Sequence, residues 1–218
     1  MPTKTKILLV DDHPLVREGL ANLIRQHPDL EVWGEAGGEA QALQLLAGGR
    51  PDLAVVDLSL ENGSGLDLIK SIKALYPSVA MLVLSMHDES LYAERALRAG
   101  ARGYLMKREA AQKVIQGIRT VLAGQLFVSE RIAAQMAERF VTGRPAGGPT
   151  VELLSDRELE VFQLLGQGQS TRQIADHLHM GFKTVQAYCA RIKEKLQLAN
   201  ATELLRSAMQ WAERHGEE

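Results

Sequence analysis

The chain has 218 residues, of which 45% are hydrophobic and 24% charged, and its formal net charge at pH 7 is −2. This composition is typical of globular proteins, the length suits two small domains, and the charge excludes a strongly basic chain. Cys189 is the only cysteine, which excludes an internal disulfide and favours a reducing compartment. The first apolar run is too short for a signal peptide or a membrane span, so we expect a cytoplasmic protein with no membrane partner.

The first half of the chain alternates short apolar runs with helical patterns. Runs typical of buried strands cover residues 6–10, 30–35, 53–58, 79–84 and 103–106. Helical periodicity covers residues 14–26, 39–47, 65–75, 91–99 and 110–123. Five strands alternating with five helices favour an α/β fold, a doubly wound parallel five-stranded sheet. We expect this domain to span residues 1–124.

The run 53–58 is the one around which this domain is organised. It is continuously apolar, contains β-branched residues, and delivers Asp57 near its end. Turn-forming residues follow at 61–65. Because functional crevices in such sheets lie beyond the carboxyl ends of the strands, we expect Asp57 to lie in a site.

Other polar residues also stand at strand ends. Asp11 and Asp12 follow the first strand, Ser85 ends the fourth, and Lys107 follows the fifth. Three carboxylates at one edge require a cation, and an all-oxygen set favours Mg²⁺. A lysine, a hydroxyl and Mg²⁺ around one carboxylate would suit a transferred phosphoryl group, with Asp57 as the nucleophile. Taken singly, each residue is better explained by a turn, a helix cap or a solvated surface charge; taken together at one edge of the sheet, they favour the functional interpretation.

The second half is predicted to be all-α. Residues 125–150 contain a helix over about 130–140 and a Gly- and Pro-rich tether from Thr142 to Pro149. Residues 151–218 follow as four helices, two of which begin with capping boxes, at Ser155 and Ser170. A short helix, a tight turn at 179–181 and a longer helix over 182–196 form a predicted helix-turn-helix.

The helix over 182–196 has two distinct faces. Its core stripe is predicted to comprise Val185, Cys189, Ile192 and Leu196. Lys183, Gln186, Ala187 and Ala190 recur on another face, and the segment 170–198 carries more basic than acidic residues. This pattern suits a helix in the major groove of DNA, although an ordinary helical bundle with solvated charges shares the periodicity.

Residues 6–123 resemble a response-regulator receiver domain, through the acidic pair, Asp57, Ser85 and the string from Ala99 to Lys107. The resemblance implies Mg²⁺ bound by Asp12 directly, by Asp11 mainly through water, by Asp57 and by the Ser59 carbonyl. It makes Asp57 the phosphoacceptor. Ser85 would move to the phosphoryl group, Lys107 would pair with it, and Tyr104 would be the switch aromatic. His13 and His87 are expected to be loop residues. Arg108 stands where many members of the family have proline.

Residues 153–211 resemble a LuxR-type (GerE) four-helix DNA-binding domain, through Leu154–Glu158, Gly168–Ser170 and Lys183–Val185. By this resemblance Gln186, Ala187 and Ala190 face the bases, while Arg172, Lys183 and Thr184 hold phosphates. Two positions depart from the usual pattern. Gly181 replaces a Ser or Thr helix cap, and Tyr188 replaces a frequent His.

Together the halves resemble the NarL/FixJ class of two-component response regulators. The resemblance implies a transcription regulator and not an enzyme, in which a sensor histidine kinase phosphorylates Asp57 and thereby controls dimerisation and promoter binding. A homodimer is expected, with Leu204, Leu205 and Ala208 either at its interface or in the domain core, and RNA polymerase is a further candidate partner. Two alternatives stay open: a phosphatase using Asp57 covalently, for which the Asp-x-Asp motif is missing, and a DNA binder whose acidic site is vestigial.

Overall fold

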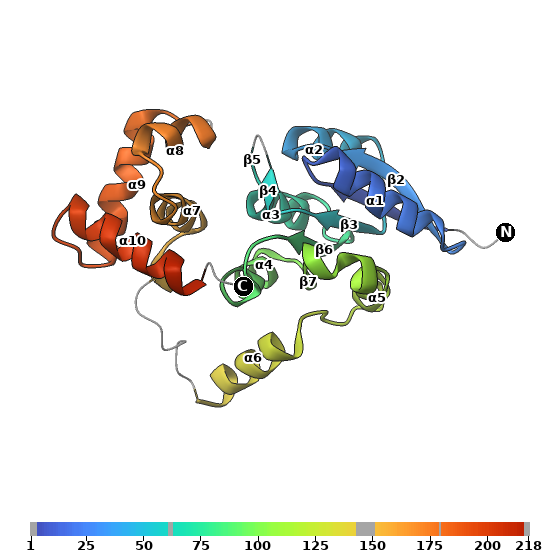
Figure 1. Ribbon diagram of the computed structural model, residues 1–218. Coiled ribbons are helices and arrows are strands. Elements are labelled where there is room, and N and C mark those ends of the chain that lie inside the picture. Colours follow the sequence, from blue (N-terminus) through green and yellow to red (C-terminus); the bar gives the residue numbers. More distant parts are fainter. Residues whose placement is uncertain (1–3, 61–62, 143–150, 179, 216–218) are drawn as a thin grey trace. The chain divides into compact units, whose positions relative to one another are not determined.

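The computed structural model describes residues 4–60, 63–142, 151–178 and 180–215. The chain divides into two compact units, Met1–Thr142 and Gly143–Glu218 (Figure 1). The Gly- and Pro-rich tether predicted from Thr142 to Pro149 lies, beyond its first residue, outside the described residues.

The first unit is built on a five-stranded sheet in which all paired strands are parallel, in the order β2-β1-β3-β6-β7. Its strands are β1 (Thr5–Val10), β2 (Leu30–Ala36), β3 (Leu53–Val56), β6 (Ala80–Ser85) and β7 (Gly103–Met106). The connecting helices are α1 (Pro14–Arg25), α2 (Glu39–Gly48), α3 (Gly65–Leu75), α4 (Glu89–Ala99) and α5 (Ala110–Leu122). The doubly wound α/β fold predicted from the sequence is confirmed.

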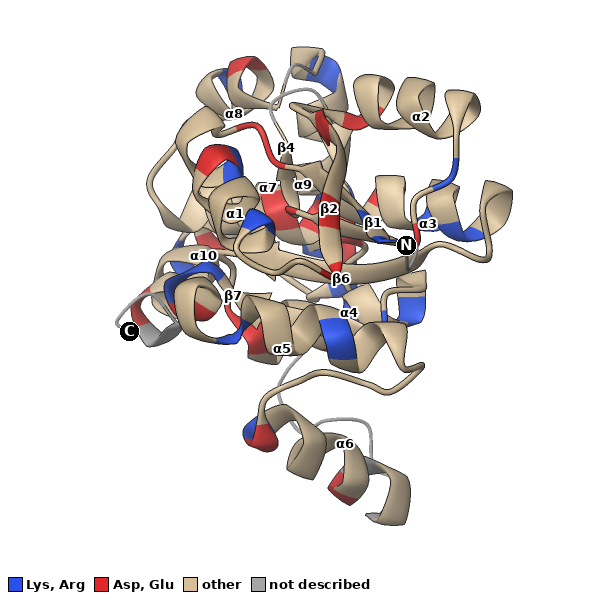
Figure 2. Cartoon of the chain, turned by 90° about the vertical axis from the view of Figure 1, so that its right-hand side faces the viewer, with Lys and Arg blue, Asp and Glu red and all other residues tan. Residues whose placement is uncertain are grey.

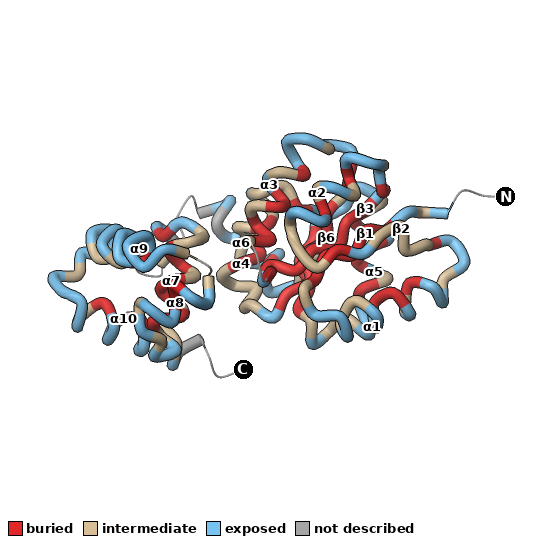
Figure 3. The backbone as a smooth tube through the Cα atoms, turned by 90° about the horizontal axis from the view of Figure 1, so that it is seen from above, coloured by how far each residue is buried: buried red, intermediate tan, exposed pale blue. Residues whose placement is uncertain are grey.

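Helices cover both faces of the sheet. Helices α1 and α5 contact each other on one face, where they enclose a core that includes Ile7, Leu9 and Val55 of the sheet. The other helices form a second group, in which α3 contacts both α2 and α4. All four residues of β3 are buried, as a continuous apolar run predicts for a central parallel strand (Figure 3). The edge strand β2 carries acidic residues, Glu31 and Glu35, a feature that discourages pairing with another sheet (Figure 2).

The strand order places one point of the sheet in a special position. The chain runs from β1 outward to β2 and then returns to the other side of β1 to form β3. The strand order therefore reverses between β1 and β3, and ligands of open α/β sheets bind beyond the carboxyl ends of strands at such a point. Asp11 and Asp57 directly follow these two strands.

Two local features differ from the sequence prediction. A short antiparallel pair, β4 (Ser59–Leu60) and β5 (Gly63–Ser64), occupies part of the predicted loop after Asp57; Glu61 and Asn62 lie outside the described residues. Helix α4 begins earlier than the predicted Leu91, because Oδ1 of Asp88 caps it by accepting a hydrogen bond from the Ser90 amide at 2.7 Å.

The second unit is helical, as predicted. It comprises a 3₁₀ turn η2 (Val151–Leu153) and helices α7 (Asp156–Gly166), α8 (Thr171–His177), α9 (Phe182–Lys195) and α10 (Ala201–His215). Both capping boxes are present, with Ser155 paired to Glu158 and Ser170 to Gln173. The predicted turn between α8 and α9 includes His179, which lies outside the described residues.

Helices α7 and α10 pack closely. A Cβ atom added to Gly166 would lie 2.5 Å from the carbonyl oxygen of Ala208, so only glycine fits at this crossing. The rings of Phe162 and Trp211 meet edge to face, with centroids 5.9 Å apart. Among the residues described, none of the helices is both long enough and apolar enough to cross a membrane.

Candidate functional site

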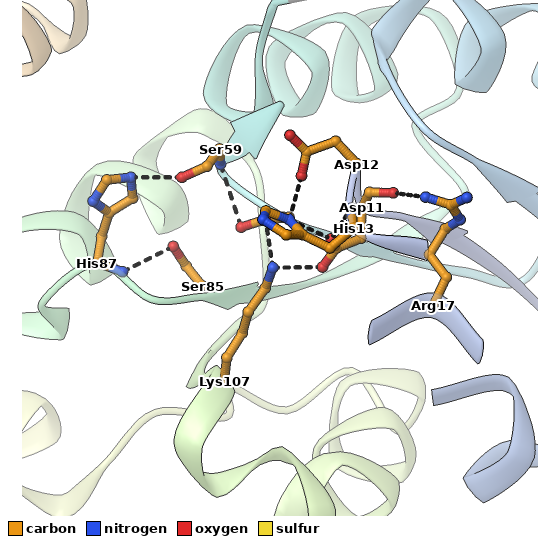
Figure 4. A network of polar contacts seen from close by, with 9 residues as sticks. Asp11, Asp12, His13, Arg17, Ser59, Ser85, His87 and Lys107 are labelled. Atoms are coloured by element: carbon orange, nitrogen blue, oxygen red, sulfur yellow. Dashed lines mark hydrogen bonds and ion pairs between the residues drawn. The ribbon is translucent and has the colours of Figure 1, made fainter. Parts of the chain in front are cut away.

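A buried ion-pair cluster lies beyond the ends of β1 and β3 (Figure 4). Asp11 and Asp57 are each only 2% exposed. The Nζ atom of Lys107, which directly follows β7, lies 2.7 Å from Oδ2 of Asp57 and 2.6 Å from Oδ2 of Asp11. One ammonium therefore bridges two buried carboxylates that would otherwise repel each other.

The surroundings of Asp57 shift its protonation. Burial raises the pKa of Asp57 from 3.8 to about 6, against the opposing effect of the hydrogen bond and charge of Lys107. Burial disfavours the ammonium of Lys107, yet its close contacts with the carboxylates of Asp11 and Asp57 outweigh this and raise the pKa of Lys107. The nearby carboxylate of Asp11 adds to the rise in the pKa of Asp57.

Asp12 and His13 complete the acidic end of the cluster. The Nδ1 atom of His13 lies 2.6 Å from Oδ1 of Asp12 and 3.3 Å from Oδ1 of Asp11. Oδ2 of Asp11 and Oδ1 of Asp12 are buried, and their contacts with Nζ of Lys107 and Nδ1 of His13, both at 2.6 Å, lack hydrogen-bond geometry. One side-chain oxygen or nitrogen atom from each of Asp11, Asp12, His13 and Asp57 lies within 4.8 Å of the others. Buried carboxylate oxygens that lack hydrogen bonds suit a hard divalent cation.

Close backbone packing against Gly65 fixes the position of Asp57. A Cβ atom on Gly65 would lie 2.0 Å from the carbonyl oxygen of Asp57, so the first residue of α3 must be glycine for the two segments to approach. On the other side, the Ser59 amide donates to Oδ1 of Asp57 at 3.3 Å.

A second network joins the loop after β6 to this site. The Ser85 hydroxyl, fully buried, accepts a hydrogen bond from the His87 amide at 3.1 Å. His87 Nε2 lies 3.0 Å from the Ser59 hydroxyl, and the buried Tyr104 hydroxyl donates to the His87 carbonyl at 2.8 Å. The His87 ring stacks on Tyr92, with centroids 4.5 Å apart. Burial, followed by the nearby charge of Lys107, lowers the pKa of His87, which makes the ring neutral at pH 7.

The second unit presents α9 to solvent on the predicted face. The six predicted DNA-contacting residues are all outside the core, and all but Arg172 lie on α9: Arg172, Lys183, Thr184, Gln186, Ala187 and Ala190 are exposed. Val185 and Ile192 are fully buried on the opposite stripe, and Cys189 is partly buried. The amide end of α9 has no side-chain cap at Gly181.

Two features of the second unit go beyond what the sequence predicted. The ammonium of Lys195 lies 2.6 Å from the buried carboxylate of Glu158 and donates to the Leu153 carbonyl at 3.1 Å, so this cation binds α9 to α7 and η2. Leu204 and Ala208, proposed above as alternatives between dimer interface and core, are 3% and 0% exposed and belong to the core. Leu205, at 40% exposure, is the accessible member of that set.

Both units match known domain families. Residues 7–119 match the response regulator receiver domain, and residues 152–208 match the bacterial regulatory proteins of the LuxR family. The transcriptional activator ExaE of Pseudomonas putida is 36% identical over 204 residues, which cover 94% of this chain and 95% of ExaE. The chain is a LuxR-type response regulator.

Other relatives agree with this assignment. The response regulator is 34% identical to the DNA-binding transcriptional activator DevR/DosR of Mycobacterium tuberculosis over 198 residues, 91% of each chain. Its fold is shared by RcsB of Salmonella enterica serovar Typhimurium, solved bound to a promoter, with a TM-score of 0.66, 24% identity and coverage of 95% and 100%. The family consists of DNA-binding transcription regulators and not of enzymes.

The receiver domain brings most of the predicted site residues together. Asp11, Asp12, Asp57 and Lys107 form one cluster, with Ser59 bonded to its edge. Ser85 and Tyr104 instead share hydrogen bonds with His87. Arg108 lies in a 3₁₀ turn, Lys107–Glu109, that leads into α5.

Three contacts of the receiver domain were not predicted. The ring of His13 lies within the acidic cluster, and His87 joins Ser59, Ser85 and Tyr104, so both are more than passive loop residues. The guanidinium of Arg17 hydrogen-bonds the Asp11 carbonyl. In the sequence, this contact was indicated only by the position of Arg17 in the first helical turn after the acidic pair.

Proposed function

We propose that this response regulator accepts a phosphoryl group on Asp57 from a sensor histidine kinase and then binds promoter DNA through α9. The observation that carries the proposal is the position of Lys107, whose ammonium bridges Asp57 and Asp11 at the point where the strand order reverses. Such a group stabilises the charge on a transferred phosphoryl group.

The chemistry follows from the carboxylate. An oxygen of Asp57 attacks the phosphorus of a phosphohistidine, the P–N bond breaks, and the electron pair and a proton go to the departing imidazole. Asp11, Asp12, Asp57 and the Ser59 carbonyl are the proposed holders of Mg²⁺, and the buried oxygens of Asp11 and Asp12 that lack hydrogen-bond geometry support this assignment. The ion would supply charge neutralisation for the phosphoryl oxygens.

The switch uses the loop after β6. The Ser85 hydroxyl, which now accepts from the His87 amide, would turn to donate to a phosphoryl oxygen. Tyr104 holds the same loop through its hydroxyl, and burial raises the pKa of Tyr104, so this donor keeps its proton. Movement of Ser85 would therefore be transmitted to the loop that Tyr104 contacts.

The DNA-binding role is assigned to the exposed face of α9. Gln186, Ala187 and Ala190 would meet base edges, since a glutamine amide pairs with adenine and alanine methyl groups contact thymine methyl groups. Arg172, Lys183 and Thr184 would contact phosphates and set the position of the helix. With two alanines at the base-facing positions, DNA shape would contribute to specificity.

Partners follow from the same assignment. The promoter complex of the relative RcsB supports promoter DNA as a ligand, and another RcsB structure describes dimers on DNA. We extend both to this chain, as a homodimer acting in the cytoplasm, with RNA polymerase as a further partner. The proposed functional domains are residues 1–124 and 151–218, joined by residues 125–150.

The test is DNA affinity with and without phosphorylation. A duplex is selected from a random-sequence pool by the full chain treated with acetyl phosphate and MgCl₂, and binding is measured by fluorescence anisotropy. We expect treatment to raise the affinity of the parent chain at least several-fold and to leave Asp57→Asn unchanged. Equal affinities of the treated and untreated parent would point to the vestigial-site alternative.

A further inference from the structure

The segment that joins α5 to the next helix, α6 (Glu130–Thr142), is built into the receiver domain. The Tyr104 amide donates to the Phe127 carbonyl at 2.8 Å, and the Phe127 amide donates to the Arg102 carbonyl at 3.0 Å. Phe127 thereby pairs in parallel with Gly103 at the open edge of β7. A Cβ atom on Gly117 would lie 3.0 Å from the ring of Phe127, so α5 makes room for this side chain.

The base of α6 is then fastened to the start of α4. The Ser129 hydroxyl donates to Oε1 of Glu89 at 2.8 Å, and Nε of Arg131 contacts the same oxygen at 3.2 Å. A second nitrogen of Arg131 lies 3.5 Å from Oδ1 of Asp88. We call these contacts of Ser129 and Arg131 with Asp88 and Glu89 the latch. Ile132, one residue further, is 4% exposed.

The side chains beside the latch leave a cavity. This cavity of about 430 Å³ is lined by Phe127, Ser129 and Arg131 and by Glu109 and Lys113 near the start of α5. The polar contacts to Asp88 and Glu89 therefore act together with the buried side chain of Ile132 in holding the base of α6. Contacts of this kind are weak enough to open locally without unfolding the domain.

The two acceptors of the latch directly follow the loop that forms the switch. Asp88 and Glu89 directly follow His87, whose amide donates to Ser85 and whose carbonyl accepts from Tyr104. Tyr104 also holds Phe127 through its own amide. One residue of β7 therefore contacts the switch loop with its side chain and the connecting segment with its backbone.

We infer that the latch couples phosphorylation of Asp57 to α6, with Arg131 as a positioning residue that holds this helix in the unphosphorylated chain. Because Asp88 and Glu89 lie within a few residues of Ser85, movement of the Ser85 hydroxyl shifts the acceptors of Ser129 and Arg131. The latch opens, and α6, the last element before residues 143–150 and the DNA-binding domain, is released. This inference rests on the proposed function.

The test is hydrogen–deuterium exchange of residues 126–142 in the full chain, with and without acetyl phosphate and MgCl₂, and with adduct formation followed by intact mass. In the parent chain we expect phosphorylation to speed exchange in this segment. In Arg131→Ala exchange should already be about two- to fivefold faster before treatment, the size expected for loss of a partly exposed ion pair, and should change little afterwards.

Two further variants sharpen the test. Arg119→Ala removes an arginine of similar exposure, paired with Asp29 elsewhere on the receiver domain, and should behave like the parent. Glu89→Gln should resemble Arg131→Ala, and the two combined should have less effect than the sum of the single changes, because the residues share one contact of the latch. An adduct without any change in exchange over 126–142, or an Arg131→Ala chain that responds like the parent, overturns the inference.

Failure of the proposed function gives a different result. If no adduct forms, the phosphorylation proposal fails, while the untreated chains still test the latch. Equal exchange over 126–142 in Arg131→Ala and Arg119→Ala would then show that Arg131 does not hold α6 and would overturn the inference.

Discussion

The ammonium of Lys107 lies 2.7 Å from Oδ2 of Asp57, across 50 residues of sequence. The pair closes the gap between the ends of β7 and β3, which are not neighbours in the sheet. It also gives Asp57 a fixed cation before any phosphoryl group arrives, as a site that stabilises developing charge requires.

Lys107→Ala should destabilise the receiver domain at neutral pH. Asp11 and Asp57 would face each other without their shared ammonium, which should lower the free energy of unfolding by about 1–3 kcal/mol in the absence of divalent cations. Urea unfolding at pH 7.5 measures the loss. MgCl₂ should restore part of it, whereas Lys113→Ala, which removes a surface pair with Glu109, should stay within about 0.5 kcal/mol of the parent. Equal stability of Lys107→Ala and the parent would contradict the role of the bridge.

The raised pKa of Asp57 predicts a specific pH dependence. The pKa of Asp57 is about 6 in the folded chain and 3.8 in the unfolded chain, so protonation of Asp57 favours folding. This contribution to the free energy of unfolding is complete below pH 3.8 and is lost as the pH rises through 6. The full difference is up to about 3 kcal/mol. Without divalent cations, Asp57→Asn should therefore gain stability over the parent between pH 4 and 6.5.

Urea titrations of both chains across this range measure the difference. The control is Asp67→Asn, which alters an exposed pair with Lys70 and should show no such divergence. If the free energies of unfolding of the parent and Asp57→Asn differ by the same amount at every pH, folding does not shift the pKa of Asp57.

The strand-end carboxylates and Lys107 could be predicted from sequence because the carboxyl ends of parallel strands share one edge of the sheet. The contacts of His87 could not, since Ser59 and Tyr104 reach it through loop geometry and side-chain rotamers that no periodicity encodes. The pairing of Phe127 with β7 was missed too, although the apolar run Leu126–Val128 was a weak signal. Helical spacing also left open whether Leu204 and Ala208 face the core or a partner, because spacing alone does not show which segment packs against that side of the helix.

Two substitutions on α9 should separate base reading from phosphate contact. Gln186→Ala should reduce discrimination at one base pair by about 1–3 kcal/mol, whereas Lys183→Ala should weaken all duplexes alike and lower the salt slope by about 1. Anisotropy titrations on the selected duplex, its single-base variants and a scrambled duplex, at several salt concentrations, distinguish these effects. Gln210→Ala, at an exposed position on α10, is the matched control. Equal losses for Gln186→Ala on selected and scrambled DNA would remove Gln186 from base reading.

Gly166→Ala should loosen the DNA-binding domain. The added methyl group would collide with the Ala208 carbonyl on α10, and overpacking of this kind costs about 1–3 kcal/mol. Thermal unfolding followed by the fluorescence of Trp211, which packs on Phe162, would report the loss, with Trp33 replaced by Phe in all chains compared. Gly181→Ala, in open space apart from Thr184 at 3.5 Å, should cost far less. A Gly166→Ala chain as stable as Gly181→Ala would mean that the helices separate without penalty.

Asp57 is proposed to accept a phosphoryl group in a cluster that holds Mg²⁺. The most direct measurement is the intact mass of the full chain after incubation with acetyl phosphate and MgCl₂, beside Asp57→Asn and beside the parent with EDTA in place of MgCl₂. We expect one phosphoryl adduct on the parent chain with MgCl₂, and none on the parent with EDTA or on Asp57→Asn. A folded parent chain that forms no adduct, or an equal adduct on Asp57→Asn, would contradict it.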